Sequence, residues 1–208
     1  MLVHSFMEDL GEIIMNKLQK KSFLPFLIFS VFVIFSVSSC KTTPKSKSLR
    51  PVYITNSKKV NLLAPGSANI VLDQVILLEG SFGKTDFNLM SYTLINLEEI
   101  NLSLFNEFGT DMGFVSYNGE AVIFDSAYFP KALPGEYIIC DIQNAFYSFE
   151  ALKANYANSG LIFEQKENCR RILDGKNLIE EISFAENTVE IKNLLRGYSY
   201  KLTIAEGF

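Results

Sequence analysis

The chain has 208 residues, a formal net charge of −4 and a single histidine, His4. This length suits one domain with accessory segments. If His4 is removed with a signal peptide, the remaining chain has no histidine, which excludes Ser-His-Asp and Cys-His catalytic sites and histidine-based metal sites. The sequence therefore predicts neither an enzyme nor a metalloprotein. It predicts no cofactor either, since "GSFGK" at 80–84 lacks the spacing of a phosphate-binding loop.

Residues 1–39 have the pattern of a cleaved signal peptide. Three lysines (17, 20 and 21) precede an uncharged run of 16 residues, Ser22 to Val37. A spanning helix needs roughly 20 apolar residues, whereas a signal-peptide core needs about 7–15. Met15 is a natural start, so residues 1–14 are interpreted as an over-extended start. An uncleaved membrane anchor is the alternative.

The apolar run ends in "VSSC" at 37–40. This resembles a bacterial lipobox, in which an aliphatic residue and two small residues precede a cysteine. The resemblance implies cleavage before Cys40 and attachment of diacylglycerol to its sulfur, with fatty acids such as palmitate adding to the anchor. Lys41, rather than aspartate, follows Cys40, which implies the outer membrane, facing the periplasm. Ordinary cleavage near the same place is the alternative.

Residues 40–59 are expected to be a basic tether, and residues 60–208 a folded body. Six lysine or arginine residues and no acidic residue lie between Lys41 and Lys59. From Val60 onward there are 10 basic and 20 acidic residues, a net charge of −10. A basic tether suits an anionic membrane surface, and an acidic body argues against a nucleic-acid partner.

Period-2 alternation of apolar and polar residues dominates the body. It predicts strands at 74–82, 85–95, 99–105, 111–117, 120–126, 160–167, 177–184, 188–195 and 198–206. Asn118-Gly119 and Asp174-Gly175 predict two-residue hairpins. The pairs Glu98-Glu99 and Glu180-Glu181 are interpreted as solvated surface, because neighbours on a strand point to opposite faces.

One segment departs from this alternation. Between Pro134 and Tyr156, apolar residues recur at steps of three and four, which predicts an amphipathic helix or two short helices broken near Ser148. The predicted fold class is mainly β with α: a curved antiparallel sheet of about nine or ten strands with helical cover on its apolar face.

From Cys40 onward the chain has 12 phenylalanines and 9 tyrosines. Such rings fill a core or line a lipid pocket equally well. The candidate groove residues are Phe87, Phe114, Phe146, Phe149, Tyr198 and Tyr200. Cys140 and Cys169 could form a disulfide, but Cys140 in "YIIC" suits a free buried thiol equally.

Four segments together resemble the LolA/LolB type of outer-membrane lipoprotein carrier, with the closest likeness to a LolB-like bacterial lipoprotein family of unknown function. They are "LSLFNEFGTDMGFVSYNG", "YIICDIQNAF", "RRILDGKNLIEEISF" and "VEIKNLLRGYSYKLTI". The resemblance implies an incomplete β-barrel with a helical lid over a hydrophobic cavity that carries acyl chains. The tryptophans of those carriers are absent here.

Two functions are therefore expected. The first is a membrane-anchored lipoprotein whose groove binds an acyl chain, a lipid or a lipidated partner. The alternative is a structural or accessory envelope lipoprotein that acts through its surface and has no cargo. Dry volume between the aromatic residues would favour the first, and a filled interior would favour the second.

Overall fold

The computed structural model describes residues 51–204 except 69 and 127–133. The signal peptide, Cys40 and the first part of the tether lie outside the described residues. The strands of the main sheet are β3 (Leu72–Phe82), β4 (Thr85–Ile95), β5 (Ile100–Phe105), β6 (Asp111–Tyr117), β7 (Val122–Asp125), β8 (Ile162–Lys166), β9 (Cys169–Asp174), β10 (Asn177–Ala185), β11 (Thr188–Asn193) and β12 (Tyr198–Ile204).

These ten strands form one antiparallel sheet in the order β7-β6-β5-β4-β3-β12-β11-β10-β9-β8. Each half of the sheet is a meander of five consecutive strands, and the halves join where β12 pairs with β3 along Tyr198–Phe82 to Ile204–Ile76. The sheet is curved but does not close into a barrel. The predicted curved antiparallel sheet with helical cover is thus confirmed.

The two predicted hairpin turns have different outcomes. Asp174 pairs with Asn177, so Gly175 and Lys176 form a two-residue loop, with Gly175 at a φ of 62° that suits glycine. By contrast, Tyr117 pairs with Val122, which leaves a four-residue loop at 118–121. The two-residue prediction there is wrong, because the Asn118 side chain accepts the backbone N–H groups of both Glu120 and Ala121, at 3.0 Å each, and stabilises the longer turn.

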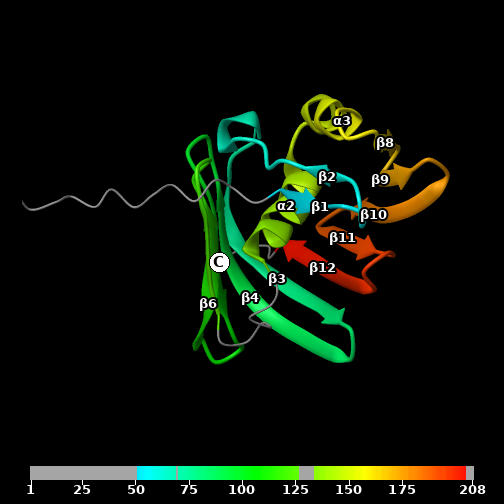
Figure 1. Ribbon diagram of the computed structural model, residues 1–208. Helices are drawn as coiled ribbons and strands as arrows, with labels where there is room; N and C mark the ends of the chain where they lie inside the picture. The colour runs from blue at the N-terminus through cyan, green and yellow to red at the C-terminus, as the bar shows by residue number, and fades with distance from the viewer. Residues whose placement is uncertain (1–50, 69, 127–133, 205–208) are drawn as a thin grey trace, which may run out of the picture. The chain divides into compact units, whose positions relative to one another are not determined.

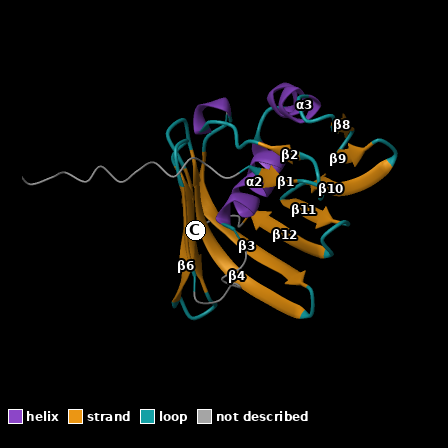
Figure 2. Ribbon diagram, viewed as in Figure 1, coloured by secondary structure: helices purple, strands orange, loops and turns teal. Residues whose placement is uncertain are grey.

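Two helices lie between the meanders in the chain: α2 (Gly135–Phe146) and α3 (Phe149–Ala157). The break falls where the sequence predicted it, because the Ser148 hydroxyl accepts the backbone N–H of Ala151 at 3.3 Å and caps α3. Helix α2 contacts β6 and β7 of one half-sheet and β11 of the other, while α3 packs on β8 (Figure 2). We call the sheet face that carries α2 the inner face.

A short hairpin of β1 (Val52–Tyr53) and β2 (Lys59–Val60) precedes the sheet and contacts α2 (Figure 1). The side chains of Val52 and Ile54 are buried in the core. The predicted boundary between tether and body at 59–60 is therefore too late in the chain, because Val52 and Ile54 already pack in the core of the body.

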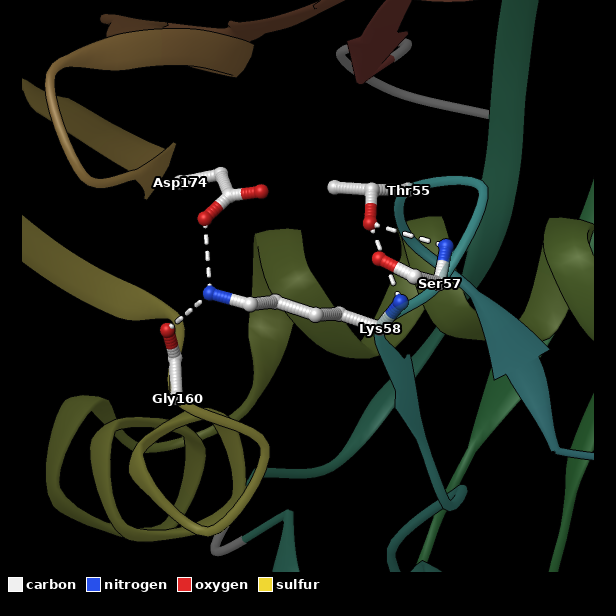
Figure 3. A network of polar contacts seen from close by, with 5 residues as sticks. All are labelled: Thr55, Ser57, Lys58, Gly160 and Asp174. Atoms are coloured by element: carbon white, nitrogen blue, oxygen red, sulfur yellow. Dashed lines mark hydrogen bonds and ion pairs between the residues drawn. The ribbon is translucent and has the colours of Figure 1, made fainter.

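Lys58 joins the β1–β2 segment to the half of the sheet that contains β8 to β12. Its ammonium group donates to Asp174 Oδ1 at 2.6 Å and to the backbone oxygen of Gly160 at 2.7 Å (Figure 3). The Thr55 hydroxyl accepts the backbone N–H groups of Ser57 and Lys58 and shapes the turn that presents Lys58. The segment is thus part of the folded body.

Candidate functional site

A cavity of about 720 Å³ lies between α2 and the inner face of β3 to β6 and β12. Its apolar lining is Leu78, Phe82, Phe87, Leu102, Leu104, Val115, Pro134, Ile138, Ile142 and Leu195. Its polar lining is Asn56, Ser81, Tyr137, Asp141, Arg196, Tyr198 and Tyr200. A volume in the range of about 300–1,000 Å³ with mostly apolar walls is typical of small-molecule sites.

An aromatic ladder forms one wall of the cavity. The ring centroids of Phe82 and Tyr198 lie 5.9 Å apart, and those of Tyr198 and Tyr200 lie 6.2 Å apart. Gly80 makes this ladder possible, because a Cβ atom there would lie 2.5 Å from the Cβ of Tyr200 on the neighbouring strand. The absence of a side chain at residue 80 therefore lets β12 approach β3 closely at Tyr200.

Three of the six predicted groove residues line the cavity, namely Phe87, Tyr198 and Tyr200. Phe114 does not, and its side chain is 36% exposed, because β6 alternates and turns Val115 and Tyr117 inward instead. Phe146 packs against the edge of the core, and Phe149 lies against Phe163 with ring centroids 5.9 Å apart. The placement of these three in a groove is wrong for this cavity.

Asp141 on α2 is the acidic residue of the lining, and only 5% of its surface is exposed. The hydroxyl groups of Tyr198 and Tyr200 both donate to its Oδ2 atom, at 2.8 and 3.0 Å. The sequence contains the signal that we missed: Asp141 shares the helix face of Ile138, Ile142 and Ala145, at steps of three and four.

A second carboxyl group, that of Glu180 on β10, lies deeper in the same region. Asn144 donates to its Oε1 at 3.1 Å, and Asn193 donates to its Oε2 at 3.0 Å. The interpretation of Glu180 as solvated surface is wrong, since the residue is 2% exposed. It occupies the same strand face as Ile182, two residues along, and that face points inward.

The two carboxyl groups alter each other's titration. Burial, and then the Glu180 charge, raise the pKa of Asp141 well above its usual range, against the two tyrosine hydrogen bonds that lower it. Burial raises the pKa of Glu180 to about 7, although its two asparagine partners lower it. Burial also raises the pKa of Tyr198 and of Tyr200, so both hydroxyl groups stay protonated and act as donors.

Arg196 lies at the solvent-exposed rim of the cavity. Its guanidinium carbon lies 4.8 Å from the centroid of the Tyr137 ring, and the group donates to the Tyr137 hydroxyl at 3.4 Å and to the backbone oxygen of Tyr53. These contacts hold the β1 segment, α2 and the loop before β12 around one opening.

Cys140 and Cys169 are both free thiols. The Cys140 sulfur lies inside the core, 3.8 Å from the Tyr156 hydroxyl and 3.9 Å from the Asn144 amide nitrogen. Burial raises the pKa of the Cys140 thiol, which makes it inert. Of the two alternatives drawn from the sequence, the structure has the free buried thiol and not the bridge.

Within the described part of the chain, no group of three or more His, Cys, Asp or Glu side chains could hold a metal ion. In the same residues, neither helix is long and apolar enough to cross a membrane.

The comparisons with known proteins give one match. No curated protein and no solved structure is similar enough to this chain to match it. The family model described as "Protein of unknown function (DUF3261)" matches residues 74–206, which contain all ten strands of the main sheet except the first two residues of β3, as well as both helices. Since the match covers more than half of the sequence, the chain belongs to the DUF3261 family.

Proposed function

We propose that this protein is a membrane-anchored bacterial lipoprotein whose cavity binds an acyl chain of a lipid or of a lipidated partner. Cys40 is the lipidated residue in this proposal, and residues 41–51 link it to the body. The protein would be held at the cell envelope, at the outer membrane facing the periplasm, and would act by binding and not as an enzyme. It needs neither a cofactor nor nucleic acid.

The observation that carries the proposal is the cavity under α2. Ten apolar residues line it, and the three inward leucines Leu78, Leu102 and Leu104 form its sheet-side floor. The apolar side chains around this cavity lack dispersion contacts on the side that faces it. An apolar ligand would restore those contacts.

The energetics favour a long apolar chain as the occupant. Each buried methylene group contributes about 0.8 kcal/mol, so a chain of about 16 carbons could offset the association cost and still bind at micromolar strength or better. The curved sheet and one helix enclose the chain from two sides, and the rim at Arg196 leaves a route of entry.

Saturable binding of a fluorescent fatty acid tests the proposal. The probe is titrated into the full-length chain carrying Cys40→Ser, exported without lipid so that no acyl chain of its own competes. We expect about one probe per protein, displaced by phospholipid. The control Phe114→Asp replaces an aromatic residue outside the cavity, so it should bind as the parent does, whereas Leu104→Asp should not.

The same variant tests the anchor. Cys40→Ser should abolish incorporation of labelled fatty acid and move the protein out of the detergent phase. Unchanged labelling would reject the lipoprotein assignment. Absence of saturable probe binding by a folded protein would reject the carrier function and favour an accessory lipoprotein that acts through its surface.

A further inference from the structure

The cavity changes character between its floor and its mouth. Leu78, Leu102 and Leu104 form the floor and are buried. Asn56 and Arg196 also line the cavity, but they are exposed to solvent and belong to its mouth. An occupant that places an apolar chain against the leucines therefore brings its other end to a cationic and polar opening.

The loop between β11 and β12 holds the backbone of Arg196 in a defined conformation. The Asn193 side chain accepts the backbone N–H of Arg196 at 2.9 Å, and the Asn193 backbone oxygen accepts the N–H of Gly197 at 2.9 Å. The Asn193 amide in turn donates to the buried Glu180 at 3.0 Å. The position of Arg196 at the mouth is therefore set by hydrogen bonds that reach into the core.

The guanidinium group of Arg196 uses only part of its donors within the protein. Its Nη2 atom donates to the backbone oxygen of Tyr53 and, at 3.4 Å, to the Tyr137 hydroxyl. Its Nε and Nη1 atoms donate to none of the residues that the structure describes. Since a guanidinium group has five N–H donors, those on Nε and Nη1 are available to a ligand.

The charge of Arg196 is not neutralised by an ion pair with any carboxylate in the described ranges. Burial, and then the Glu180 charge, raise the pKa of Asp141 well above its usual range, and burial raises the pKa of Glu180 to about 7. The Arg196 charge lowers both pKa values, but burial outweighs it. Because these two groups hold their protons more strongly than ordinary carboxyl groups, they offset little of the positive charge at the mouth.

Two neutral side chains add hydrogen-bond donors beside Arg196. Asn56 lines the mouth, and its side-chain amide has no hydrogen-bond partner among residues 51–68, 70–126 and 134–204. The Tyr137 hydroxyl accepts from Arg196, so its own proton can be donated to a ligand. Three chain segments thus bring donors to one opening, which suits a head group rich in acceptor oxygens.

We propose that the natural ligand is an amphiphile with one long apolar chain and an anionic head group, a carboxylate or a phosphate, which Arg196 binds at the mouth of the cavity. This inference rests on the proposed function and specifies its ligand class. Hydrogen bonds from a guanidinium group to an oxyanion are charge-assisted and are stronger than those between neutral groups. The chain of the same ligand lies against the leucines of the floor.

Other head groups fit the mouth less well. A hydroxyl head accepts a hydrogen bond from Arg196 but brings no charge. An ammonium head has no acceptor for the arginine donors and is repelled by them. The expected order, with the anion tightest and the ammonium weakest, is the reverse of what adsorption to a body of net charge −10 would give.

Displacement of an uncharged apolar dye, N-phenylnaphthylamine, tests this order. The ligands are laurate, dodecyl phosphate, dodecanol and dodecylamine, which have matched chain lengths. They are added below their aggregation concentrations to the full-length Cys40→Ser chain at about pH 6.5, where free carboxyl groups are ionised and amines are protonated. We expect the better of the two anions to bind about fivefold tighter than dodecanol, and dodecylamine to be the weakest.

Two variants of equal charge change locate the preference. Arg196→Gln removes the guanidinium charge at the mouth, so the preference for the anions over dodecanol should disappear while dodecanol binds as in the parent chain. Lys192→Gln removes an exposed cation from β11, outside the cavity lining, and should leave the preference unchanged. A preference that survives Arg196→Gln, or that disappears in Lys192→Gln, would overturn the inference.

The outcomes also distinguish this inference from the function on which it rests. If neither anion binds more tightly than dodecanol to the parent chain, the anion site is overturned and acyl-chain binding remains. If a folded chain shows no saturable dye binding and no displacement, both are overturned. The order of laurate and dodecyl phosphate tells a fatty acid from a phosphorylated lipid, and either order supports the inference when the tighter anion exceeds dodecanol. If Arg196→Gln does not fold, the order of affinities in the parent chain and in Lys192→Gln still decides the matter.

Discussion

Helix α3 covers a filled core, whereas the N-terminal half of α2 stands over an open cavity. Leu152 and Tyr156 on α3, and Phe163 and Ile172 on the strands beneath it, are all almost completely buried. The rings of Tyr156 and Phe163 stack with centroids 5.2 Å apart. Tyr137 and Ile138 on α2 are only partly buried, and both line the cavity.

This difference in packing assigns different roles to the two ends of one sheet. The packed end under α3 contributes to stability, and the end under α2 provides space for binding. Interiors packed to full density gain dispersion contacts on every side, and the α3 end of the molecule has this arrangement. The α2 end lacks it, and there the apolar side chains surround space that a ligand could fill. Substitutions at the two ends should therefore act on different measured quantities.

The largest contrast is expected for truncation of one aliphatic side chain in each region. Leu152→Ala creates a new cavity in a filled core and should lower the free energy of unfolding by about 3–4 kcal/mol. Ile138→Ala enlarges a cavity that already exists and should cost about 1 kcal/mol, because fewer contacts are lost. Urea denaturation of both variants measures the difference. Equal losses would mean that the cavity is packed in solution.

The second prediction concerns pH and Glu180. Unfolded glutamate has a pKa near 4.5, and the folded value is about 7, so the folded state holds this proton over a pH range in which the unfolded state has released it. The free energy of unfolding should therefore fall as pH rises from about 4.5 to about 7 and then level off. For this one group the loss is about 3 kcal/mol, and Asp141 acts in the same direction.

Glu180→Gln isolates this contribution, since the amide cannot ionise. The difference in stability between pH 5 and pH 8 should be smaller in the variant than in the parent chain. Glu181→Gln is the matched control, because Glu181 lies on the other strand face and pairs with Arg171 at 2.8 Å. If the free energy of unfolding changed with pH in the same way in the parent and in Glu180→Gln, Glu180 would not be buried in its protonated form.

The third prediction concerns a substitution that fills the cavity and leaves the packed region under α3 unchanged. Ile138→Phe places a larger side chain in the cavity and should weaken fatty-acid binding about tenfold, with the melting temperature almost unchanged. Ile123→Phe, on the exposed part of β7, is the control for added apolar surface. Unchanged binding in Ile138→Phe would place the acyl chain elsewhere on the protein.

Much of the fold follows from the sequence, because strands and helices each require their own regular spacing of apolar residues. Alternation predicted nearly every strand of the main sheet. The steps of three and four predicted either one helix or two short helices broken near Ser148, and the structure has the two helices. The β1–β2 hairpin escaped this reasoning, since two-residue strands are too short for a period to be visible.

The site was harder to predict, for physical reasons that its residues show. The cavity depends on the distance between α2 and the sheet, which no local pattern encodes, so Phe87 and Tyr200 could be proposed as lining but not distinguished from core residues. Asp141 and Glu180 were predictable in principle from their positions on apolar faces. The charge of Glu180 favoured a surface interpretation, which holds only where no hydrogen-bond donors converge on the group.

The smallest effect is expected at Lys58, which ties the N-terminal segment to the packed end and not to the cavity. Its side chain is about one-third exposed, and the ammonium group binds both Asp174 and the backbone oxygen of Gly160. Partly exposed ion pairs contribute about 0–1 kcal/mol, so Lys58→Ala should cost at most about 1 kcal/mol of unfolding free energy and leave fatty-acid binding unchanged. Lys192→Ala, whose pair with Glu190 is more exposed, should have an even smaller effect. Hydrogen exchange at residues 52–60 should rise in Lys58→Ala alone, because the segment would then be held mainly by the buried side chains of Val52 and Ile54. A loss of probe binding in this variant would show that Lys58 also positions Asn56 and Tyr53 at the cavity, and the two ends of the molecule would then not act separately.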